Sequence, residues 1–133
     1  MIEKLQDLLN NSYSPYSHFP VAAIVVTKDG KEFKGVNVED ASYRAGACAE
    51  RVALFSALAA GYKKKDFKEI HIMTKSNDYG TPCGTCRQLI YELCDSDTLI
   101  RCYRHTGEYA DYSVSELCPY FFGEDDLSWE ADM

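Results

Sequence analysis

Two stretches of the sequence decide the predicted fold: CAERVALFSALAA at residues 48–60 and CGTCRQLIYELC at residues 83–94. Each is rich in good helix formers and begins at a cysteine, so each predicts a helix, and Gly61 marks the end of the first. The apolar side of the first helix is formed by Val52, Phe55, Leu58 and Ala59. The remaining elements follow from the segments on either side of these two helices.

Five segments predict β-strands. Residues 21–27 and 32–38 are rich in β-branched and aromatic residues, and they flank Lys28-Asp29-Gly30-Lys31, which is typical of a hairpin turn. Three further strands are expected at residues 69–74, 98–104 and 108–112. A short loop, His105-Thr106-Gly107, separates the last two strands, so we expect them to pair antiparallel.

Two more helices complete the predicted order. The first covers the chain start, where apolar residues recur at helical spacing at Ile2, Leu5, Leu8 and Leu9. The last is short and begins at Ser113, because Ser113 and Glu116 have capping-box spacing. The order predicts an α/β fold: a three-layer α/β/α sandwich with a mixed sheet of about five strands. We find no repeat or linker, so residues 1–133 are expected to form one domain.

Composition limits the partners. The 133 residues include 14 basic and 21 acidic ones, for a net charge of −7. Five of the acids lie in residues 123–133, which leaves −2 for the rest of the chain, and clustered basic charge for nucleic acid is missing. No apolar run approaches the roughly 20 residues of a membrane span, and residues 1–10 do not resemble a signal peptide. We therefore expect a soluble, cytoplasmic protein without nucleic-acid or membrane partners.

The spacing of the six cysteines points to a metal. Cys83 and Cys86 are separated by two residues, and both lie at the start of a predicted helix, as Cys48 does. Helix N-termini favour the thiolate form of cysteine, so these three residues can fill three corners of a zinc tetrahedron. The isolated cysteines and the histidines lack ligand spacing, and we assign no site role to Cys94, Cys102, Cys118, His18, His71 and His105.

Glu50 follows Cys48 by two positions and is not needed as a ligand. A carboxylate beside an open metal position can take a proton from water and pass it to a substrate nitrogen, which is the arrangement described for zinc deaminases. Three thiolates also carry more negative charge than Zn²⁺ neutralises. We expect Arg51, together with Arg87, to offset that charge by donating hydrogen bonds to the cysteine sulfurs.

Taken together, the motifs CAER (residues 48–51) and PCGTCRQ (residues 82–88) resemble those of the small homotetrameric cytidine deaminases of pyrimidine salvage. The resemblance extends over about residues 14–127. It implies that Cys48, Cys83 and Cys86 bind one Zn²⁺ per chain and that Glu50 is the catalytic acid and base. The implied reaction is hydrolytic deamination of cytidine and 2′-deoxycytidine to the corresponding uridines.

The same resemblance implies a set of substrate-binding residues. Phe19 would pack near the pyrimidine ring, and Asn37 and Glu39 would bind the ribose. Ala41 and Tyr43, and separately Phe122, would complete the pocket of a neighbouring subunit in a homotetramer. The full implied set is Phe19, Asn37, Glu39, Ala49, and, from neighbouring subunits, Ala41, Tyr43 and Phe122.

Two segments depart from the family pattern. Residues 21–24 read VAAI where V-G-A-A is usual, which is expected to alter packing behind the pocket through Ala22 and Ile24. Residues 39–41 read EDA where E-N-A is usual, so Asp40 adds a carboxylate near the sugar-binding glutamate.

Three alternatives stay open at this stage. A deaminase of nucleic acid would use similar zinc chemistry, but the acidic balance disfavours it. A blasticidin-type aminonucleoside deaminase is closer, although Phe19 and Arg51 favour the ordinary nucleoside enzyme. A non-catalytic zinc module would need a fourth protein ligand, and the sequence has only three residues with suitable spacing.

Overall fold

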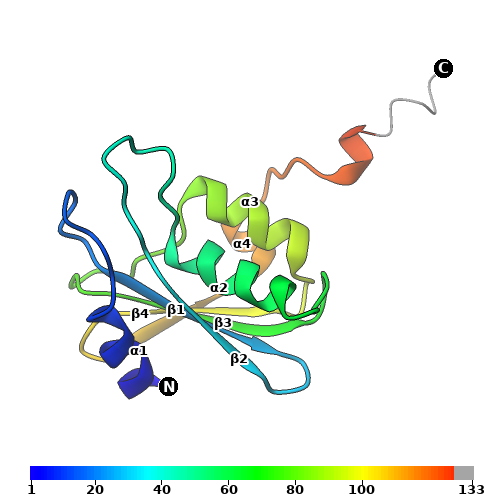
Figure 1. Cartoon of the computed structure of the whole chain (residues 1–133). Coiled ribbons are helices and arrows are strands. Elements are labelled where there is room, and N and C mark those ends of the chain that lie inside the picture. Colours follow the sequence, from blue (N-terminus) through cyan, green and yellow to red (C-terminus); the bar gives the residue numbers. More distant parts are fainter. Residues whose placement is uncertain (128–133) are drawn as a thin grey trace.

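A five-stranded mixed sheet forms the centre of the chain in the computed structural model, which describes residues 1–127 (Figure 1). The strand order is β2-β1-β3-β4-β5, and only β3 and β4 pair parallel. The strands are β1 (Val21–Thr27), β2 (Glu32–Val36), β3 (Phe67–Thr74), β4 (Leu99–Tyr103) and β5 (Tyr109–Tyr112). The antiparallel pairing predicted for the last two strands is confirmed, and the strand predicted at 32–38 ends two residues earlier.

Helices cover both faces of the sheet, so the predicted three-layer α/β/α arrangement is confirmed. Helix α1 lies on one face, and α2, α3 and α4 lie on the other (Figure 1). The bounds are α1 (Ile2–Leu9), α2 (Ala49–Ala59), α3 (Gly84–Leu93) and α4 (Val114–Leu117), followed by a 3₁₀ helix, η1 (Glu124–Leu127). The predicted capping box of α4 is present, because Ser113 Oγ accepts from the Glu116 amide and the Glu116 carboxylate accepts from the Ser113 amide.

Helix α2 packs closely against strand β2. Gly35 of β2 is buried there, and a Cβ at this position would lie 2.6 Å from the Ala53 amide nitrogen and 3.1 Å from the Ala53 Cβ. Only glycine on the strand and small residues on the helix permit this approach. The contact therefore holds the first turns of α2 directly on the sheet.

The side of α2 that is buried differs from the side predicted from the sequence, which was formed by Val52, Phe55, Leu58 and Ala59. The residues that face the sheet are Ala49, Glu50, Ala53, Leu54 and Ala57. Phe55 is 48% exposed, and Val52 and Leu58 are only half-buried. The close approach at Gly35 explains the difference, because large side chains do not fit between the helix and the strand, whereas alanines do.

The burial of the isolated cysteines agrees with their predicted lack of a role in the site. Cys94 and Cys102 are buried, as expected for isolated cysteines, and Cys118 is half-buried. Within residues 1–127 no helix is both long and apolar enough to cross a bilayer. The predicted single domain includes residues 128–133, which lie outside the described part of the chain, and it stays a prediction.

We expect the substitution Gly35→Ala to lower the free energy of unfolding by about 2–3 kcal/mol, because the new methyl group overlaps the backbone of α2. Urea unfolding of the zinc-loaded protein measures this. Gly84→Ala is the matched control, since a Cβ on Gly84 meets nothing within 4 Å, and it should leave stability unchanged or raise it by up to about 1 kcal/mol. Equal stabilities of the two variants would contradict the packing argument.

Candidate active site

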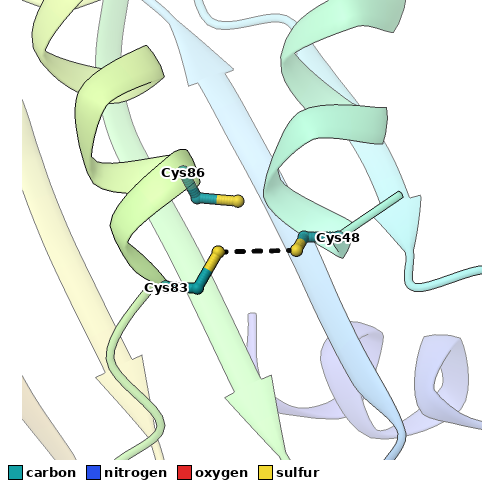
Figure 2. A group of neighbouring side chains, drawn as sticks. All are labelled: Cys48, Cys83 and Cys86. Carbon is teal, nitrogen blue, oxygen red and sulfur yellow. Dashed lines mark hydrogen bonds between the residues drawn. The ribbon is translucent and has the colours of Figure 1, made fainter. Parts of the chain in front are cut away.

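Three cysteine sulfurs converge between the starts of α2 and α3 (Figure 2). Cys48 is the residue that precedes α2, Cys83 precedes α3, and Cys86 lies in the first turn of α3. Both Cys48 and Cys83 have extended backbone geometry, and neither uses its side chain to cap its helix. The sulfurs are therefore free to face one another, next to the positive ends of two helix dipoles.

The distances between the sulfurs suit a tetrahedral metal site. All three atoms lie within 4.8 Å of one another, and Cys48 Sγ is 3.7 Å from Cys83 Sγ. A disulfide would need about 2.05 Å. A tetrahedron with Zn–S bonds of about 2.3 Å has edges of about 3.8 Å, which matches the observed separation. In the described part of the chain, residues 1–127, the cluster offers three sulfur ligands. Three cysteine sulfurs suit zinc, which takes four ligands, so one position would remain for water or substrate.

The thiol groups of Cys48 and Cys86 shift each other's pKa in opposite directions. A hydrogen bond from Cys86 holds the pKa of the Cys48 thiol below its usual value, and the charge of Arg51 acts in the same direction. The same interaction with Cys48, together with burial, raises the pKa of the Cys86 thiol. At least one thiolate is therefore available at neutral pH as a ligand.

Glu50 is buried beside this cluster. It is the second residue of α2, is only 4% exposed, and lines the same cavity as Cys48 and Cys83. Burial raises the pKa of its carboxyl group, and the nearby charge of Cys48 raises it further. A raised pKa makes this carboxyl a better proton acceptor than an exposed glutamate.

A cavity of about 250 Å³ opens over the cysteines. It brings together six residues predicted from the sequence: Phe19, Asn37, Cys48, Ala49, Glu50 and Cys83. Its other lining residues are Val21, Ile72, Thr74, Gly80 and Thr81. Sequence reasoning missed Ile72, Thr74, Gly80 and Thr81, because they come from the end of β3 and the following loop and carry no motif.

A second cavity of about 240 Å³ shares Asn37 and Cys48 with the first. Its lining includes Glu39, Tyr43 and Arg51, three more of the predicted residues, and also Asp40. The two cavities are therefore neighbours: the first is lined by Cys48 and Cys83, and the second reaches the acidic pair at residues 39–40.

Asn37 and Glu39 hold the segment that carries Phe19. Asn37 Oδ1 accepts from the Val21 amide at 2.9 Å, and its Nδ2 donates to the Phe19 carbonyl at 2.9 Å. Glu39 Oε1 accepts from the amides of Tyr16 and Ser17, and the Ser17 hydroxyl also donates to this carboxylate. These hydrogen bonds, the one from the Ser17 hydroxyl above all, lower the pKa of Glu39. Both side chains thus fix the position of the chain at the cavity edge.

The residues predicted to act across an interface lie on the surface of the single chain. Tyr43 is 81% exposed and Phe122 is 56% exposed, and Ala41 is exposed as well. Ala41 and Phe122 line neither of the two cavities formed by the described chain. Phe122 is anchored through its backbone, which pairs with the side chain of Gln88 on α3.

The two arginines differ in their surroundings. Arg51 donates to the Gly46 carbonyl at 3.2 Å, and it also lies close enough to Cys48 to lower the pKa of that thiol. Arg87 donates to the Pro82 carbonyl, the Leu117 carbonyl and Thr81 Oγ1. Donation from Arg87 to a cysteine sulfur stays a prediction, whereas its bond to Pro82 braces the loop that precedes Cys83.

Comparison with known proteins agrees with this geometry. A family model described as the cytidine and deoxycytidylate deaminase zinc-binding region matches residues 1–102. A cytidine deaminase of Halalkalibacterium halodurans is 37% identical over 128 residues, which cover 96% of each chain. A probable cytidine deaminase of Dictyostelium discoideum is 38% identical over 136 residues, covering 98% of this chain and 90% of that one.

A solved structure shows the same fold. The crystal structure of cytidine deaminase from Burkholderia pseudomallei superposes with a TM-score of 0.86 at 42% sequence identity. The match covers 91% of this chain and 95% of that one.

We expect the purified protein to hold one zinc per chain, and Cys86→Ala to lose it, because removal of one sulfur leaves two ligands. Cys102→Ala is the matched control: Cys102 is buried, burial raises the pKa of its thiol to about 12, and it is not part of the cluster. Elemental analysis after dialysis measures the zinc content of the parent and of both variants. A Cys86→Ala protein that keeps one tightly bound zinc would refute the ligand assignment.

Proposed function

The chain belongs to the cytidine and deoxycytidylate deaminase family, and from this we propose that it is a zinc-dependent deaminase of free nucleosides. Its substrates are cytidine and 2′-deoxycytidine, its products are uridine, 2′-deoxyuridine and ammonia, and its role is pyrimidine salvage in the cytoplasm. One observation carries the proposal: a buried glutamate lies in the same cavity as a three-sulfur cluster.

Cys48, Cys83 and Cys86 hold the metal in this proposal, one Zn²⁺ per chain. When bound, zinc activates water as a nucleophile at neutral pH. Arg51 limits the negative charge that three thiolates bring to the site, because its guanidinium lies beside Cys48. Cys48 and Cys83 line the cavity that also contains Glu50, so a metal held by these cysteines would be open to water and substrate from that side.

Glu50 moves the protons of the reaction. It takes one proton from the attacking water and delivers it to ring N3, while the water oxygen forms a bond to C4. It then carries the remaining hydroxyl proton to the amino group, so that the C4–N bond breaks and ammonia leaves. The raised pKa of the buried carboxyl supports this exchange, because burial makes the protonated form of Glu50 easier to reach than that of an exposed glutamate.

The other predicted residues bind the nucleoside. Phe19 lies at the cavity edge and is 45% exposed, which leaves its ring face available to a pyrimidine. Ala49 lines the cavity at the start of α2, where backbone N–H groups lack partners within the helix. Asn37 and Glu39 lie toward the sugar end, and they keep Phe19 in position as well.

The active assembly in this proposal is a homotetramer. Tyr120 is 96% exposed, and Phe121 and Phe122 are about half exposed, so three adjacent aromatic side chains lie largely on the surface. The apolar side of α2 is open around Phe55 as well. Apolar surface of this kind is typical of an interface. Neighbouring subunits would supply Ala41, Tyr43 and Phe122 to one another's pockets.

Glu50→Gln should keep the fold and the zinc but lower kcat by at least about 100-fold, because an amide cannot shuttle protons. The loss of absorbance on conversion of cytidine to uridine measures the rate, and elemental analysis checks the metal. Glu108→Gln is the control, since this exposed carboxylate makes only a surface ion pair with Arg104. A Glu50→Gln enzyme within about tenfold of the parent would exclude the proposed role.

Phe122→Ala should weaken nucleoside binding, seen as a rise in KM, while each chain keeps its zinc. Mixed tetramers of Phe122→Ala and Glu50→Gln chains should regain part of the activity, because a Phe122→Ala chain retains Glu50 and borrows Phe122 from its neighbour. Subunits are mixed by mild dissociation and reassembly, and light scattering reports the size. A fully active monomer at the assay concentration would overturn the shared-site arrangement.

A further inference from the structure

Thr74 is a buried residue of the cavity wall without an assigned role. It ends strand β3, lies opposite Val21 of β1, and lines the cavity that contains Glu50. The residue is only 3% exposed. Its hydroxyl oxygen is buried and has no hydrogen-bond partner within the described chain. A buried hydroxyl without a partner is costly, so its retention at this place calls for an explanation.

Other buried threonines of the chain show the usual behaviour. Thr98 is 2% exposed, and its hydroxyl donates to the Phe67 carbonyl at 2.8 Å. Thr27 is fully buried, and its hydroxyl accepts from the Lys31 amide at 2.9 Å. Both lie away from the cavity lining. The threonine with the unpaired hydroxyl is therefore the one in the candidate pocket.

Gly80 keeps the Thr74 side chain in place. A Cβ on Gly80 would collide with Thr74 Cγ2 and would lie 3.2 Å from Thr74 Oγ1. The loop backbone thus packs on the threonine methyl group as closely as glycine allows. This contact limits rotation about χ1, so Oγ1 keeps one position in the cavity wall.

Other polar side chains of the cavity are already engaged. Both ends of the Asn37 amide bond to the backbone, and Thr81 Oγ1 accepts from Arg87. Glu50 transfers protons in the proposed reaction. Thr74 is left with an unused donor and acceptor at the wall of a pocket that is to bind a heteroaromatic ring.

We infer that Thr74 is a substrate-binding residue whose hydroxyl donates a hydrogen bond to an acceptor on the polar edge of the pyrimidine ring. The inference rests on the proposed deaminase function and adds a contact to it. The acceptor is the C2 carbonyl oxygen, because N3 gains a proton in the proposed reaction. The ring carries this oxygen before and during the reaction, so the hydrogen bond contributes to binding more than to the chemical step.

The test compares Thr74→Val with Thr74→Ser. Valine keeps the branched shape against Gly80 and removes the hydroxyl, whereas serine keeps the hydroxyl and removes the methyl group. We expect Thr74→Val to raise KM for cytidine about tenfold, the effect of one lost hydrogen bond, with kcat within about twofold of the parent. Thr74→Ser should stay within about threefold in KM. The dissociation constant of uridine, measured by calorimetry, should change by the same factor as KM. This measurement does not depend on turnover.

Stability separates a binding role from a structural one. Thr74→Val should hold or raise the Tm, because it replaces an unpaired buried hydroxyl by a methyl group. Thr98→Val is the matched control. It should lower the Tm, since the Phe67 carbonyl loses its donor, and it should leave KM unchanged. Zinc content should equal that of the parent in all three variants.

Each outcome has one meaning. A parent enzyme that is inert toward cytidine would overturn the proposed function, and this inference with it. An active parent whose Thr74→Val variant keeps the parental KM and uridine affinity would overturn the inference alone. A Thr74→Val variant that loses Tm together with zinc would show a structural role, and it would overturn the inference as well.

Discussion

The contact between α2 and Gly35 positions the chemistry of this protein. Because a glycine on β2 meets alanines on α2, the helix lies directly on the sheet, and the close contact fixes the distance between its first turns and β2. Cys48 and Glu50 belong to that turn. The start of α3 approaches the same place and contributes Cys83 and Cys86 (Figure 2).

This arrangement brings together four groups that are negative when deprotonated, of which Cys86 and Glu50 are buried. Two of the three clustered cysteines, Cys48 and Cys83, line one cavity with Glu50, and burial raises the pKa of its carboxyl group. Buried charge of one sign destabilises a fold unless it is compensated. Two helix N-termini, Arg51 and a divalent cation would supply the compensation. The features that make the site costly for stability are the same ones that suit it to proton transfer.

Several surfaces of the single chain fit the proposed assembly better than they fit an isolated chain. The α2 side around Phe55, the exposed Tyr43 and the aromatic run at residues 120–122 leave apolar area in contact with solvent. Residues with implied roles in the pocket, Ala41 and Phe122, lie outside both cavities of their own chain. A homotetramer in which neighbours complete each pocket accounts for both facts with one proposal.

The sequence by itself determined the order of helices and strands, the capping box at Ser113 and the grouping of three cysteines at two helix starts. These features depend on spacing within a few residues, where helical period, turn residues and caps act locally. Its resemblance to the cytidine deaminases also named the family, and Phe19, Asn37 and Ala49 lie around one cavity with Glu50.

The tertiary structure alone decided which side of α2 is buried. The amphipathic pattern pointed to Phe55, but the fit against Gly35 selected the alanines, since close packing depends on the partner surface. Tertiary structure also brought Thr74 and Gly80 to the pocket and engaged Asn37 and Glu39 with the segment before β1. Such contacts join residues far apart in the chain, and no local pattern encodes them.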